Sequence, residues 1–153
     1  MKISRASTIP VFRGKRTKQN LRETPLAFEQ LYERLTGLLK PYEKYFEVRA
    51  NTSTEYELWT THIFRITNNR ARYQKGALFA AVVIRKTFVT FFLYPVYLFP
   101  DLKNNMNERL KPLLTSGSCF HFKKNEELPL SELNDLIDEG LKLYKEQGWI
   151  NSR

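Results

Sequence analysis

Apolar side chains recur at three- and four-residue spacing in two long segments, one in each half of the chain. This spacing places them on one face of an α-helix. The first predicted helix has Thr24 as its cap and Pro25 at its first position, and it ends at Pro41. The second runs from Leu128 to a stop at Gly148. The predicted buried stripes are Phe28, Leu31, Tyr32, Leu35, Leu38 and Leu39 in the first helix, and Leu133, Leu136, Ile137, Leu141 and Tyr144 in the second.

Between these helices the pattern changes to branched and aromatic runs that are typical of strands. Residues 45–66 hold such runs around a polar turn at 51–54, and residues 77–84 and 87–94 predict an antiparallel hairpin that turns at Arg85 and Lys86. A third helix is predicted from Asp101 to Leu114, limited by Pro112, and a last strand over residues 116–124. The pattern therefore predicts an α+β fold: a mainly antiparallel sheet with helices packed against one face.

Most of the net charge of +9 lies at the start of the 153-residue chain. Residues 1–24 hold seven basic side chains against Glu23 alone, and they show no apolar periodicity. We predict a basic flexible arm over residues 1–24 and one domain over residues 25–153. The composition of the arm is also that of an organellar transit peptide, but a cytoplasmic protein with a basic tail is the preferred interpretation.

The cysteine count and hydropathy bear on location and association. One cysteine forms no internal disulfide, which fits a reducing compartment such as the cytoplasm. The longest apolar run, 88–99, is about half the length that a membrane span needs and contains Pro95. We therefore expect a cytoplasmic protein with no membrane contact, as a monomer or weak dimer.

Cys119 and His121 are the only Cys–His pair close in sequence. In a strand they share one face, with Phe120 and Phe122 on the other, and their Cβ atoms stand roughly 6–7 Å apart. No orienting group or oxyanion pocket accompanies them, and the ligands for a zinc site are missing. We expect no enzyme activity, no metal and no cofactor. Both residues are candidates, with Tyr94 and Tyr97, for a shallow small-molecule pocket beside the Pro95 break.

Cations interleaved with aromatic residues suggest nucleic-acid binding as an alternative. One such segment is 61–76, and the arm would add its charge. The competing interpretation of residues 61–76 is an exposed sheet edge protected by charge. The candidate residues are Arg13, Lys15, Arg16 and Lys18 in the arm, and Arg65, Arg70 and Arg72 in the body.

Two further motifs each have two interpretations. Asp135, Asp138 and Glu139 share a helical face and suit a hard cation, but acids early in a helix also complement its dipole. The turn at 115–118, "TSGS", offers backbone N–H groups to an anion, but a turn before a strand explains it equally well.

Two stretches, "ALFAAVVIRKTFVTFFLYPVY" and "TSGSCFHFKKNEELPLSELNDLIDEGLKLYKEQGW", resemble the YdhG-like family, a bacterial domain of unknown function. The resemblance covers roughly residues 26–150. It implies a small cytosolic α+β domain without established catalysis, and some relatives are described as frataxin-like iron chaperones. The expected function is thus a non-catalytic binding or accessory module for a small molecule or protein, with nucleic-acid binding and iron handling as alternatives. The matching motifs are Phe79-Ala80-Ala81, Phe91-Phe92-Leu93-Tyr94-Pro95, Thr115-Ser116-Gly117 and Leu128-Pro129-Leu130.

Overall fold

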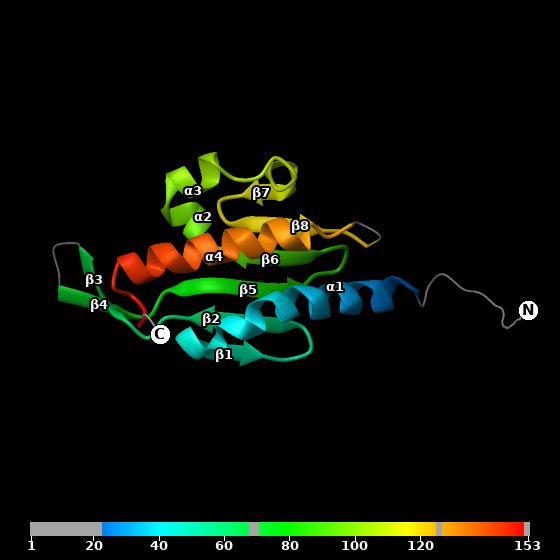
Figure 1. The fold of residues 1–153 in the computed structure, drawn as a ribbon. Coiled ribbons are helices and arrows are strands. Elements are labelled where there is room, and N and C mark those ends of the chain that lie inside the picture. The colour runs from blue at the N-terminus through cyan, green and yellow to red at the C-terminus, as the bar shows by residue number, and fades with distance from the viewer. Residues whose placement is uncertain (1–22, 68–70, 125–126, 152–153) are drawn as a thin grey trace, which may run out of the picture.

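The computed structural model describes residues 23–67, 71–124 and 127–151. In this part of the chain a six-stranded antiparallel sheet, in the order β1-β2-β5-β6-β8-β7, forms the centre of an α+β fold (Figure 1). Two long helices, α1 (Glu23–Leu39) and α4 (Leu130–Glu146), lie over the same face of this sheet. The strands are β1 (Glu47–Asn51), β2 (Glu55–Trp59), β5 (Leu78–Ile84), β6 (Val89–Leu93), β7 (Leu114–Ser116) and β8 (Cys119–Phe122).

Shorter elements connect and extend this frame. The 3₁₀ helix η1 (Lys40–Tyr45) follows α1, and α2 (Tyr94–Leu98), α3 (Pro100–Asn104) and η2 (Lys111–Leu113) lie between β6 and β7. A separate two-stranded hairpin, β3 (Ile63–Thr67) and β4 (Ala71–Lys75), projects from one end of the molecule (Figure 1). No helix in the described ranges is both long enough and apolar enough to cross a membrane.

The core fills the space between the sheet and the two long helices. All five residues of the predicted stripe in α4 are buried, as are five of the six in α1, with Leu38 half-buried. Phe79, Phe91, Phe120 and Phe122 meet them from the sheet, each without exposed surface. Burial of such side chains is the main favourable term in folding. The predicted helical periodicity is thus confirmed.

The predicted helix from Asp101 to Leu114 is wrong. Only α3 and η2 are helical there, and Leu114 is already in β7. Pro112 lacks the N–H that a regular helix would need, and the Asn107 side chain accepts the backbone N–H of Arg109 instead. The apolar positions are still used, because Leu102 in α3 is buried, as are Met106 and Leu110 in the non-helical segment that follows.

The predicted last strand over residues 116–124 is also corrected, since it is part of a hairpin. β7 and β8 pair around a turn at Gly117, whose φ of 42° lies in the left-handed region. β8 itself alternates as predicted, with Phe120 and Phe122 buried and Cys119 and His121 half-buried.

Several boundaries also differ from the predictions. α1 as described already includes Glu23, one residue before the predicted cap Thr24, and Pro41 stands in the first turn of η1. Pro95 stands in the first turn of α2, which begins at Tyr94, because proline suits the first turn of a helix. The β1–β2 turn at residues 52–54 and the β5–β6 hairpin are confirmed.

Candidate functional site

The face of the sheet opposite α1 and α4 is the candidate site. In the described part of the chain the helices pack on the other side: α1 contacts β5 and β6, and α2 contacts β5 and α4. The strand registers align two rows of side chains across this uncovered face. One row is Glu57, Ala81, Phe92 and Cys119, and the other is Glu55, Val83, Thr90 and His121.

An aromatic stack stands at the β8 end of the second row. The ring of Phe88, just before β6, lies on the imidazole of His121 with centroids 4.1 Å apart and planes 23° from parallel. Burial lowers the pKa of His121 below its ordinary value of 6.5, and the nearby Arg85 cation lowers it further. The lowered pKa favours the neutral imidazole of His121 at pH 7, and the exposed Arg85 cation is near this ring.

We expect Phe88→Ala and Arg85→Gln each to raise the pKa of His121, the first variant more, because burial is the larger cause. In the wild-type chain His121 binds a proton less tightly when folded than when unfolded, so acidification below pH 6.5 should reduce stability through this group. Proton NMR titration of the imidazole measures the shift, and Lys86→Gln is the charge-matched control. An unchanged pKa in both test variants would contradict this geometry.

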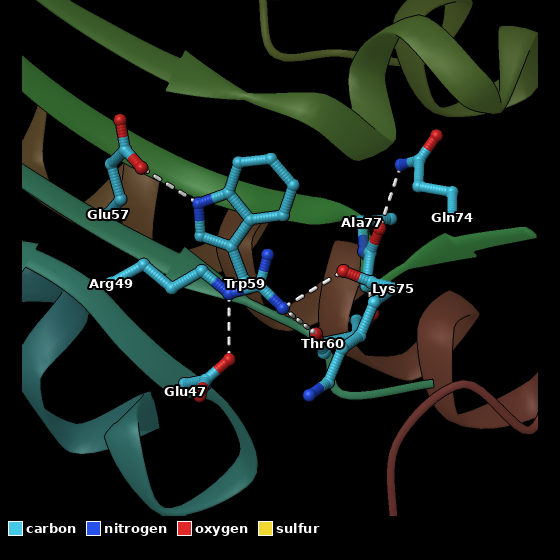
Figure 2. Close-up of polar contacts among 9 residues, drawn as sticks. Glu47, Arg49, Glu57, Trp59, Thr60, Gln74, Lys75 and Ala77 are labelled. Carbon is cyan, nitrogen blue, oxygen red and sulfur yellow. Dashed lines mark hydrogen bonds and ion pairs between the residues drawn. The ribbon is translucent and has the colours of Figure 1, made fainter. Parts of the chain in front are cut away.

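A second aromatic group, Trp59, lies at the β1–β2 side of the face (Figure 2). Its indole N–H donates to Glu57 Oε1 at 2.8 Å, and the Arg49 guanidinium lies 4.6 Å from the ring centre. Arg49 also bonds to Glu47 at 2.7 Å. The face therefore has an acidic side at β1–β2, while Arg85 and Lys86 are exposed at the β5–β6 turn. The adjacent Glu57 raises the pKa of Glu55, mainly by a hydrogen bond between the two carboxyl groups.

The structure does not assemble the four-residue pocket predicted from sequence. Tyr94 and Tyr97 stack on each other with centroids 5.5 Å apart in α2, after the end of β6, on the side of α4. His121, in β8, pairs with Thr90 near the start of β6, and its side chain is on the uncovered face. Cys119, opposite Phe92, is a free half-buried thiol. The tyrosine pair and His121 thus lie at different ends of β6 and on different sides of the sheet.

The structure does not bring the predicted nucleic-acid-binding residues together on one surface either. Arg13, Lys15, Arg16, Lys18 and Arg70 lie outside the described residues. Arg65 is in β3 and Arg72 in β4, so both belong to the hairpin that projects at one end of the molecule. α1 begins at the opposite end, where the β5–β6 turn lies (Figure 1). The arm therefore joins the body at the end of the molecule that holds the β5–β6 turn, and not at the end that holds the β3–β4 hairpin.

Two acidic residues of α4 have protein partners. Asp138 accepts a short hydrogen bond from the Tyr42 hydroxyl, and Glu132 pairs with Arg109 at 2.7 Å. Within the described ranges, no three His, Cys, Asp or Glu side chains are grouped as a metal site would require. Asp138 is thus involved in holding η1 against α4.

Sequence reasoning missed the roles of Trp59, Phe88 and Phe92. Their alternation with buried neighbours is visible in the sequence, but alternation does not say which face stays uncovered. That depends on where the helices pack.

Comparisons with protein-family models, with curated proteins and with solved structures found no match for this chain.

Proposed function

We propose that this protein is a non-catalytic binding module that holds single-stranded nucleic acid on the uncovered face of its sheet. The observation that supports this function is the Phe88–His121 stack beside the exposed cations Arg85 and Lys86. Proteins that bind single strands combine aromatic platforms for the bases with cations for the phosphates.

The charge distribution supports one placement of the strand. Glu55 and Glu57 on β2 repel phosphates, so the bound single-stranded nucleic acid should follow β6 and β8 instead. The arm adds seven cations in residues 1–22, and it joins the chain at the end of the molecule with the β5–β6 turn. Such a distribution favours binding without sequence preference.

The finer proposals follow the sequence. A free Cys119 suits the cytoplasm. A monomer or weak dimer is supported by the sheet edges, because β1 contains an irregular register and β7 has three residues. Membership of the YdhG-like family stays a proposal, supported by the order of the β5–β6 hairpin, the Gly117 turn, β8 and α4.

Fluorescence anisotropy with a labelled oligothymidylate tests the function. Replacing Phe88 and His121 together by alanine should weaken binding about tenfold or more, since stacking contributes about 1–3 kcal/mol per base. The control Tyr97→Ala removes an exposed stacked ring on the helix side and should leave binding unchanged. No binding by the whole chain at low salt would reject the function, and equal binding by the double variant would reject the platform.

Charge variants locate the phosphate path. Deleting residues 1–22, or replacing Arg85 and Lys86 by glutamine, should weaken binding and reduce its salt dependence. Replacing Arg65 and Arg72 by glutamine removes two positive charges from the β3–β4 hairpin, as many as the Arg85 and Lys86 replacement removes from the β5–β6 turn. This variant should weaken binding less. The reverse order would move the interface to the β3–β4 hairpin.

A further inference from the structure

We propose a second binding site, for a small phosphate monoester, in the pocket between α3, η2 and the β7–β8 turn. The pocket has a volume of about 400 Å³, within the range usual for small-molecule sites. It is separate from the Phe88–His121 platform, so this proposal does not depend on nucleic-acid binding.

The charge of the lining favours an anion. Lys103 and Lys111 contribute ammonium groups, and no carboxylate lines the pocket. Within the described part of the chain, Lys103 pairs with no carboxylate. Lys111 pairs at 2.8 Å with Glu108, whose side chain is 85% exposed. Such a surface pair is worth little, so a phosphate dianion would displace Glu108 at small cost.

The remaining lining suits the rest of a monoester. Asn104 and Ser116 offer amide and hydroxyl groups for the phosphate oxygens. Met106, itself buried, and Leu114 supply apolar surface for a short organic group. Gly117 completes the turn without a side chain that would narrow the pocket. Cations, neutral donors and an apolar patch therefore meet in one cavity.

The local fold explains why these groups meet. Pro112 and the Asn107 turn interrupt the helix that the apolar spacing predicts, and the chain instead returns to the sheet edge as η2 and β7. In a continuous helix over residues 101–114, Lys103 and Lys111 would both lie on that helix, and the β7 residues would not lie between them.

NMR titration of the full chain, labelled with ¹⁵N, tests the site with phenyl phosphate as the probe. We expect saturable shifts of the Asn104 and Thr115–Gly117 amides, weaker binding of inorganic phosphate and none of phenol at the same place. Lys103→Gln should weaken phenyl phosphate about tenfold, the usual effect of losing one charge-assisted contact. Lys142→Gln, an exposed lysine of α4 outside the pocket, is the matched control and should change nothing.

The outcomes separate the two sites. Absence of saturable shifts, or equal affinity in wild type and Lys103→Gln, overturns the pocket and leaves the nucleic-acid proposal standing. Phenol binding as strongly as phenyl phosphate overturns the anion specificity. The variant with Phe88 and His121 both replaced by alanine should bind phenyl phosphate as the wild type does, and a loss there would show that the pocket is not an independent site.

Discussion

Gly76→Ala should remove roughly 3 kcal/mol or more of the free energy of unfolding, within the range for strained and overpacked positions. Gly76 has a φ of 89°, a backbone angle that residues with a side chain rarely adopt. A Cβ there would lie 2.3 Å from the Thr60 carbonyl oxygen and 2.5 Å from Arg49 Nη2. The carbonyl belongs to the backbone and cannot move aside cheaply.

The surrounding contacts explain why the site is tight (Figure 2). Arg49 Nη2 donates to the carbonyl oxygens of Lys75 at 3.0 Å and Thr60 at 3.4 Å, and the Gly76 N–H donates to the His62 carbonyl. Thr60 is fully buried, and its hydroxyl accepts the N–H of Ala77. These bonds hold the base of the β3–β4 hairpin to the edge of the main sheet. A side chain at Gly76 would therefore disturb both the hairpin and the adjoining part of the sheet.

Two other glycines are matched controls in urea unfolding. Gly148 has φ of 79° with open space around its Cβ position, so Gly148→Ala isolates the backbone cost of about 1 kcal/mol. Gly37, inside α1, has open space and no positive φ, so Gly37→Ala should stabilise by up to about 1 kcal/mol. Equal effects at Gly76 and Gly148 would show that crowding by Thr60 and Arg49 is unimportant.

Tyr144→Ala should cost about 4 kcal/mol, the usual range for deleting a buried aromatic side chain. Tyr144 has no exposed surface, and its ring lies 5.1 Å from Phe79 and 5.0 Å from Trp149, in edge-to-face contacts. Through Trp149 the cluster reaches Phe64 of the β3–β4 hairpin, 5.1 Å away. The variant should therefore also loosen the hairpin, with faster hydrogen exchange in residues 63–67.

Tyr144→Phe separates the hydroxyl from the ring. The hydroxyl donates to the Leu78 carbonyl oxygen at 2.7 Å, and burial raises its pKa far above the usual range. Losing this bond should cost about 1–2 kcal/mol, because a buried acceptor stays unpaired. Tyr97→Ala, at an exposed tyrosine, should change stability by less than about 0.5 kcal/mol. A loss at Tyr97 as large as at Tyr144 would contradict this description of the core.

Local patterns in the sequence determined much of this structure. The stripes of α1 and α4 follow from helical spacing, and the β5–β6 hairpin follows from two apolar runs with a short polar turn between them. The division of β8 into Phe120 and Phe122 against Cys119 and His121 follows from strand alternation. Each of these features depends on residues close together in the chain, so the sequence alone is sufficient to find them.

Only the tertiary structure decided which surfaces meet. The pairing of β2 with β5 and of β6 with β8, and the separation of the β3–β4 hairpin from the main sheet, depend on contacts between distant residues. The same contacts put His121 against Phe88 and away from Tyr97, and they bring Lys103 close to the β7–β8 turn. Periodicity predicts whether a side chain lies on the buried or the exposed face of its helix or strand. Its neighbours on that face depend on how whole elements pack, and the packing energy is shared among residues far apart in sequence.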